Sequence, residues 1–198
     1  MTKMPTVFFG HGSPMIALDH NELTGGVADL GRTVLDKFGR PQAILMVSAH
    51  WYTRGTWVQS TSRPRQIYDM GGFPPALYEV KYEPDGFPAL APRVIELLGN
   101  RANVDDSWGI DHGTWTVLVH AFPKADIPVV QLSVNAEISP QASFEIGRQL
   151  SCLVNEFATV TSTRGYRSAR AITVSASCRA GASPRSSRWA NCGGIRRS

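Results

Sequence analysis

The sequence is poor in cysteine and has no long apolar run. It holds three cysteines among 198 residues and no Cys-x-x-Cys pair, which excludes a zinc ribbon and a disulfide framework. Its longest uninterrupted apolar stretch, 43–47, is far too short to cross a bilayer. The apolar segment near the N-terminus stops at Phe9 and runs into Gly-His-Gly, which is not the pattern of a signal peptide. We therefore expect a soluble, cytoplasmic protein without a membrane partner.

Lysine and acidic side chains are both missing from residues 159–198. This segment contains eight of the 20 basic residues of the chain, all of them arginine. The 12 remaining basic residues stand against 16 acidic ones, so residues 1–158 are mildly acidic although the formal net charge of the chain is +4. The pI near 9.2 therefore describes the end of the chain. It does not indicate a nucleic-acid partner, and we expect none.

The segment 154–198 lacks the hydrophobic periodicity of helices and strands. Its composition shifts to Arg, Ser, Ala and Gly, and it contains Cys178 and Cys192. Three interpretations remain open: a disordered basic tail, a small folded unit, and a stretch translated in a shifted reading frame. We assign residues 1–153 to the folded domain and expect 154–198 to be disordered.

The first 153 residues alternate between strand and helix patterns. Short apolar runs predict buried strands, and apolar residues at helical spacing predict amphipathic helices between them. The predicted strands span 6–9, 43–48, 57–60 and 127–134, and the predicted helices span 22–38, 88–98 and 140–153, with a further helix beginning near 113. A long loop rich in Pro, Gly and aromatic residues fills 61–87, and loops of this length are usually functional. The pattern predicts an α/β layered domain with a central, largely parallel sheet flanked by helices.

Three of the five histidines share a setting. His11 follows the first predicted strand directly, His50 follows the second, and His112 precedes a predicted helix after a polar turn. In parallel α/β sheets the ligand site lies beyond the carboxyl ends of the strands, so we expect His11 and His50 to converge there. An imidazole in that position serves as a metal ligand or a general base. Asp111 would either orient the His112 imidazole or cap the following helix.

Other polar residues are weaker candidates. His20 is expected to lie in a helix-capping region, and His120, on a helix, is expected to be structural. Ser13 or Ser48 would give a serine nucleophile if a histidine and an aspartate lay beside it, but the chain has no Gly-x-Ser-x-Gly elbow. The glycines on either side of His11 resemble a phosphate-binding loop, although the Walker spacing and its lysine are absent.

Five motifs occur in a specific order and spacing: FFGHGSPM, VSAHW, GGFPPALY, GIDHGTW and ADIPVVQLSV. Together, over about residues 4–153, they resemble the class III extradiol dioxygenases of the LigB family, in the bacterial and plant branch that contains the DOPA extradiol dioxygenases. The resemblance implies an α/β enzyme that opens the ring of a catechol such as DOPA next to its hydroxyls, with O₂ and a non-haem divalent metal. Sirohydrochlorin chelatases also place HGS after a strand, but a metal-insertion role gives no reason for GGFPPALY or DHGTW.

By this resemblance, His11 and His50 are metal ligands and His112 is the catalytic acid/base. The implied metal is Fe(II) for catalysis, because the reaction with O₂ needs a redox-active ion. Zn(II) suits the same histidines without supporting the O₂ step. The implied partners are a small-molecule catechol and O₂. The sequence assigns neither a substrate-binding residue nor an oligomeric state.

The sequence departs from the family after His120. Family members take further ligands from a His-Asn-Leu motif and a Pro-Glu-His motif, and neither is present here. We interpret the C-terminal part of the family fold as missing and favour a frame disruption after about Leu153. We therefore expect a weak or inactive dioxygenase. The alternative is a non-catalytic fragment that keeps residual metal binding.

Overall fold

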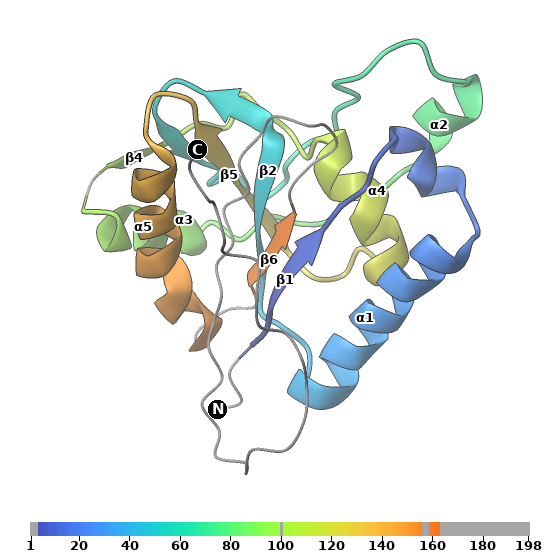
Figure 1. The fold of residues 1–198 in the computed structure, drawn as a ribbon, viewed down its shortest axis with the longest axis horizontal. Coiled ribbons are helices and arrows are strands. Elements are labelled where there is room, and N and C mark those ends of the chain that lie inside the picture. Colours follow the sequence, from blue (N-terminus) through green and yellow to red (C-terminus); the bar gives the residue numbers. More distant parts are fainter. Residues whose placement is uncertain (1–3, 100, 156–158, 163–198) are drawn as a thin grey trace, which may run out of the picture.

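The computed structural model describes residues 4–99, 101–155 and 159–162 (Figure 1). Its strands are β1 (Thr6–Phe9), β2 (Ile44–Thr53), β3 (Thr56–Val58), β4 (Ala102–Val104), β5 (Val129–Asn135) and β6 (Thr159–Ser162). Its α-helices are α1 (Glu22–Phe38), α2 (Pro75–Glu79), α3 (Leu90–Leu97), α4 (His112–Ala121) and α5 (Pro140–Leu150). The 3-10 helices are η1 (Pro14–Leu18) and η2 (Ser151–Asn155).

The described strands form a four-stranded sheet in the order β2-β5-β3-β4 and a two-stranded pair of β1 and β6. The pairs β2–β5, β3–β4 and β1–β6 are parallel, and β3–β5 is antiparallel. The apolar halves of β2 and β5 are buried throughout, as expected for parallel strands covered on both faces. The predicted α/β architecture with a largely parallel sheet is confirmed.

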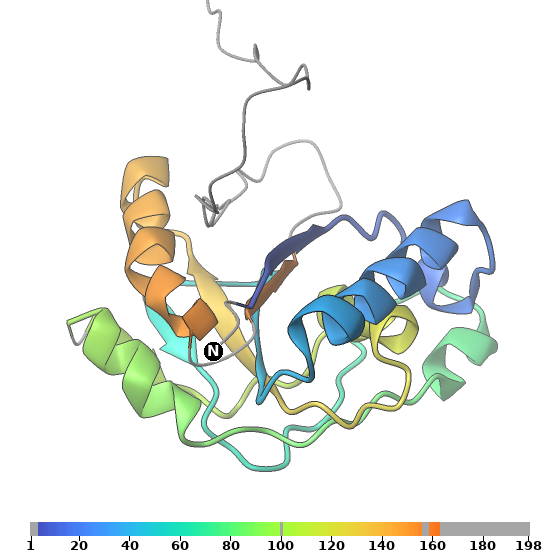
Figure 2. The same ribbon diagram turned by 90° about the horizontal axis from the view of Figure 1, so that it is seen from below.

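Helices cover both faces of the four-stranded sheet, with α1 and α4 on one side and α3 and α5 on the other (Figure 2). Val34 of α1 and Ile44 of β2 belong to the core on the first side. Val94 of α3, Leu150 of α5 and Leu45 of β2 belong to the core on the second side. Because successive side chains of a strand point to opposite faces, β2 contributes to both cores.

Local sequence determines where α1 begins and how closely it packs against α4. The Asn21 side chain accepts the backbone N–H of Thr24, and the Thr24 hydroxyl accepts the backbone N–H of Asn21, which together form a capping box. Farther along, Gly31 allows α1 to lie directly against α4. A Cβ at this position would be 1.9 Å from the carbonyl oxygen of Ala121. The predicted helix over 22–38 is confirmed.

Three expectations from the sequence need correction. β1 is only partly buried, because Phe9 belongs to the core while Phe8 is 50% exposed, and β1 pairs with β6 alone among the described strands. β2 continues beyond Ser48, so His50 lies within the strand and not after it. The segment predicted to be disordered contains the end of η2 and the strand β6. The remainder of that prediction, 163–198, lies outside the described residues.

Several short elements escaped the sequence patterns. The strand β4 has three residues, and the helices η1 and α2 have five each. Elements of this length are too short to show a hydrophobic period. The predicted loop 61–87 is otherwise irregular and contains α2. In the described part of the chain, no helix has the length and the apolar composition that a membrane span requires.

Candidate functional site

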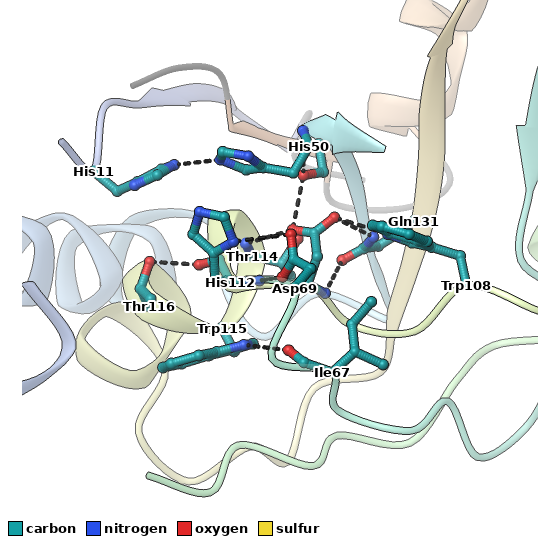
Figure 3. Close-up of polar contacts among 12 residues, drawn as sticks. His11, His50, Ile67, Asp69, Trp108, His112, Thr114, Trp115, Thr116 and Gln131 are labelled. Carbon is teal, nitrogen blue, oxygen red and sulfur yellow. Dashed lines mark hydrogen bonds and ion pairs between the residues drawn. The ribbon is translucent and has the colours of Figure 1, made fainter. Parts of the chain in front are cut away.

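Three histidines from distant parts of the sequence meet at one point (Figure 3). His11 lies in the loop after β1, His50 lies in β2, and His112 is the first residue of α4. Each offers one ring nitrogen, and the three atoms lie within 4.8 Å of one another. The Nε2 atoms of His11 and His50 are 2.9 Å apart. The predicted convergence of His11 and His50 is confirmed, and His112 joins them.

An irregularity in β2 positions His50. The strand is in register with β5 up to Ser48 and again from Tyr52, and the register shifts in between. Within this bulge the backbone N–H of His50 donates to Ser48 Oγ at 3.3 Å. A bulge re-aims the side chains that it carries, and here it brings the imidazole onto the first turn of α4. Gly113 permits that approach, because a Cβ there would lie 2.4 Å from His50 Cδ2.

Asp69, from the long loop after β3, holds His112. Its Oδ2 is 2.9 Å from His112 Nδ1, and its Oδ1 accepts the His112 backbone N–H at 2.8 Å. Burial opposes ionisation of Asp69, but the hydrogen bonds from His112 outweigh it and lower the pKa of the carboxyl. Because a carboxylate only accepts, His112 Nδ1 carries the proton. The other ring nitrogen, Nε2, points toward His11 and His50 (Figure 3).

Burial keeps the other two imidazoles neutral. Desolvation, followed by the neighbouring His50 and His112, lowers the pKa of His11 to about 4. Desolvation and His112 also lower the pKa of His50. The neutral imidazole is the form that binds a metal. At neutral pH the site thus presents uncharged nitrogen donors.

This donor set fits a divalent transition metal. Two ligand nitrogens about 2.1 Å from a metal and at right angles to each other lie about 3.0 Å apart. The His11 and His50 Nε2 atoms, at 2.9 Å, match that spacing. Imidazole nitrogen is a ligand of both iron and zinc. His11 and His50 are therefore suited to hold one ion together.

Asp111 lies next to the histidines and is completely buried. Its Oδ1 accepts hydrogen bonds from Ser48 Oγ at 2.8 Å and from the Thr114 backbone N–H at 3.2 Å. Its Oδ2 accepts from Trp108 Nε1 at 3.1 Å and from Gln131 Nε2 at 3.0 Å. Burial and a neighbouring carboxylate raise the pKa of Asp111, while the bonds from Trp108 and Ser48 oppose the rise. The Asp111 carboxyl group thus accepts four hydrogen bonds, two at each oxygen.

Of the two roles left open for Asp111, the structure assigns the helix cap, since Asp111 is the N-cap of α4. The orienting carboxylate of His112 is Asp69 instead. Sequence reasoning did not single out this role, because the two residues are 43 positions apart and Asp69 lies in a loop without periodicity. The only feature of the sequence that pointed to Asp69 was the long aromatic-rich loop that contains it, because loops of this length are usually functional.

The weaker candidates lie outside the three-histidine cluster. His120 Nε2–H donates a hydrogen bond to Ile16 O at 2.8 Å, as expected for a structural histidine. His20 is exposed, and its ring centroid is 6.5 Å from that of His120. Ser13 caps η1. The Ser48 hydroxyl donates to Asp111, so it has no histidine acting as its base.

Comparisons with known proteins find a matching family and similar curated proteins. A family described as "Catalytic LigB subunit of aromatic ring-opening dioxygenase" matches residues 5–163. The curated protein "4,5-DOPA dioxygenase extradiol" from Escherichia coli (strain K12) is 48% identical over 157 residues, which cover 78% of this chain and 56% of the relative. The protein of the same name from Beta vulgaris is 38% identical over 156 residues, which cover 76% and 58%.

A solved structure also matches. The crystal structure of an uncharacterized protein from Escherichia coli K12 aligns with a TM-score of 0.65 and 41% identity, covering 80% of this chain and 59% of that one. The chain therefore spans a little under three fifths of the length of these relatives. The segment matched by the family contains His11, His50 and His112.

Proposed function

The chain belongs to the LigB family of aromatic ring-opening dioxygenases, and we propose that it is an extradiol dioxygenase, which cleaves a catechol ring next to its two hydroxyls. The proposed substrates are O₂ and a catechol such as DOPA, and both oxygen atoms enter the product. The names of the relatives at 48% and 38% identity support this substrate class. The observation that carries the proposal is the convergence of His11, His50 and His112.

His11 and His50 are the proposed ligands of a divalent metal, with Fe(II) as the active ion. When bound, Fe(II) supplies the redox chemistry that lets triplet O₂ react with a singlet catechol. The 2.9 Å between the two Nε2 atoms and the lowered pKa values of both imidazoles support this assignment. Zn(II) suits the same nitrogens, but it does not support the step with O₂.

His112 is the proposed acid/base. Asp69 Oδ2 accepts a hydrogen bond from Nδ1–H at 2.9 Å, so Nε2 is free to take a proton from a catechol hydroxyl. The imidazolium that results is stabilised by the Asp69 carboxylate, in the way that an aspartate supports a catalytic histidine in hydrolases. His112 then returns the proton to the ring-opened product. General acid/base catalysis of this kind contributes about 10²–10⁴-fold to the rate.

A metal-binding chain without turnover is the second candidate. It is favoured by the small number of proposed ligands, because His11 and His50 are two and a non-haem iron site normally has three protein ligands. This candidate needs only His11 and His50, and it predicts metal affinity without ring cleavage. A cytoplasmic location stays a prediction for both candidates.

Turnover by the full chain tests the proposal. The protein is loaded with Fe(II) without oxygen and mixed with DOPA in air-saturated buffer, while absorbance follows the yellow product and an electrode follows O₂. We expect one O₂ consumed per product, loss of turnover in His50→Ala, and retained turnover in His120→Ala, whose ring bonds Ile16 outside the site. Fe(II) binding without turnover supports the second candidate. A chain that binds no Fe(II) contradicts the metal site in both.

A further inference from the structure

Ser48 stands between two parts of the site. Its hydroxyl donates to Asp111 Oδ1 at 2.8 Å, and its oxygen accepts the backbone N–H of His50 at 3.3 Å. Ser48 is 1% exposed, so the protein and not bulk water fixes the direction of this hydroxyl. It lies at the point where β2 loses its register with β5. One serine thus connects the bulge to a buried carboxylate.

That carboxylate is itself immobilised. Asp111 receives hydrogen bonds from β2 through Ser48, from α4 through the Thr114 backbone, from β5 through Gln131 and from the preceding loop through Trp108. A carboxylate has about four acceptor positions, so all of them are used. Asp111 is a fixed point to which the bulge and the first turn of α4 are both attached.

The His50 imidazole has little freedom between these attachments. Its ring centroid lies 3.8 Å from that of His112, and its Cδ2 lies against Gly113. Its Nε2 must also stay near that of His11 if both are to bind one ion. Sites of this kind lose affinity when a ligand moves by about 0.5 Å. The position of the bulge therefore matters for binding.

We propose that Ser48 and Asp111 form a positioning pair that sets the place of the His50 imidazole and thereby the metal affinity of the site. The pair acts through the His50 backbone and the start of α4, and it is not part of the ligand set. The proposal rests on the proposed function for the role of His50 as a ligand. Loss of such outer partners typically lowers metal affinity by about 10–100-fold.

The experiment uses the full chain and the variants Ser48→Ala, Asp111→Asn and the double variant. Co(II) serves as the probe, with affinity measured by competition against a chelator. Spectra of ¹⁵N-labelled histidine in the metal-free protein report the ring nitrogens directly. Thr24→Ala is the matched control, because it removes a buried hydroxyl that bonds only Asn21 in the cap of α1. Thermal unfolding is recorded for every protein.

We expect Ser48→Ala to bind Co(II) about 10–100-fold more weakly than the wild type and to shift the His11 and His50 ring signals. Thr24→Ala should lower the Tm without either change. The double variant should bind about as weakly as the weaker single variant, because the two residues act as one unit. If Asp111→Asn does not fold, the Co(II) affinity and the histidine signals of Ser48→Ala test the proposal without it.

Two results would overturn the proposal. The first is a Ser48→Ala chain whose Tm falls while its histidine signals and Co(II) affinity stay at wild-type values, which would make the pair a purely structural one. The second is a double variant whose loss of Co(II) binding free energy equals the sum of the losses in the two single variants. A wild-type chain that binds no Co(II) contradicts the proposed function, and the metal-free histidine spectra still decide whether the pair positions His50.

Discussion

His112 donates two hydrogen bonds to the Asp69 carboxylate, from the imidazole Nδ1 at 2.9 Å and from the backbone N–H at 2.8 Å. The first bond sets the tautomer and the rotation of the ring, and the second fixes the start of α4. A loop residue thereby controls both the direction and the tautomer of the proposed base.

Replacement of Asp69 by Asn should impair catalysis more than metal binding. The amide can present a donor to His112 Nδ1, which favours the tautomer whose proton lies on Nε2 and removes the lone pair that accepts the catechol proton. We expect kcat to fall by about 10²–10⁴-fold, with Co(II) affinity changed only a few-fold. Asp106→Asn is the control, since that carboxylate bonds Ser60 and Thr61. An equal loss of affinity and kcat would make Asp69 part of the metal site.

His112→Ala should retain metal and abolish ring cleavage. The proposed ligands His11 and His50 remain in place, whereas the group that accepts the catechol proton is gone. The measurement is metal content per chain after dialysis, together with product formation under saturating DOPA. A variant that loses its metal would show that His112 is a third ligand.

Gly113→Ala should weaken metal binding through a steric effect alone. The new methyl group would lie 2.4 Å from His50 Cδ2 and 3.2 Å from Ser48 Oγ, so the imidazole has to move. We expect a loss in Co(II) affinity of about 10-fold or more, because ligand placement within about 0.5 Å is required. Gly25→Ala is the control, since no atom lies within 4 Å of its added Cβ. Unchanged affinity would mean that the backbone of β2 or α4 shifts to accommodate the methyl group while the His50 imidazole stays in place.

Two glycines of α1 should respond to alanine in opposite directions. At Gly31 a Cβ would be 1.9 Å from the carbonyl oxygen of Ala121, so α1 and α4 must separate, and we expect a loss of about 1–3 kcal/mol in the free energy of unfolding. At Gly26 the added Cβ meets nothing within 4 Å, and helix propensity should raise that free energy by about 0.5–1 kcal/mol. Urea unfolding of the Gly31→Ala and Gly26→Ala variants measures both changes. Equal effects would contradict the close contact between the helices.

The stability of the metal-free chain should fall as the pH is lowered from 6.5 to about 4. Folding lowers the pKa of His11 from 6.5 to about 4, so in this window the unfolded chain binds a proton that the folded chain does not. One such group changes the free energy of unfolding by at most about 1.4 kcal/mol per pH unit, and it has no effect above the window, where it is neutral in both states. His11→Gln should flatten the slope measured by urea unfolding, and His20→Gln, at an exposed position, should not.

Elements with a clear hydrophobic period could be predicted from the sequence. The helix over 22–38 and the apolar core of β2 follow from spacing and from a continuous apolar run, which depend only on neighbouring residues. The convergence of His11 and His50 was predicted from the rule that parallel strands present their carboxyl ends at the same edge. The rule held only in outline, because His50 lies within β2 and β1 pairs with β6 outside the four-stranded sheet. These predictions did not require knowledge of the tertiary contacts that the loops make.

The rest of the site depends on contacts between distant residues. Asp69 reaches His112 across 43 positions, and Gln131 reaches Asp111 across 20. No periodicity marks either residue, because each is placed by tertiary packing. The bulge of β2 was missed for a related reason. A register shift is a relation between two strands, and a single strand pattern that runs past Ser48 does not reveal it.

The two proposed ligands are anchored unequally. His50 belongs to β2, a ten-residue strand of the four-stranded sheet whose apolar half is buried between the two helical layers. His11 follows β1, which contributes Phe9 to the core but pairs with β6 alone in the described part of the fold and leaves Phe8 half exposed. Local opening costs less where few apolar contacts must be broken. We therefore expect ion exchange to proceed by release of His11 when β1 detaches, at a rate governed by that local fluctuation and largely independent of global unfolding.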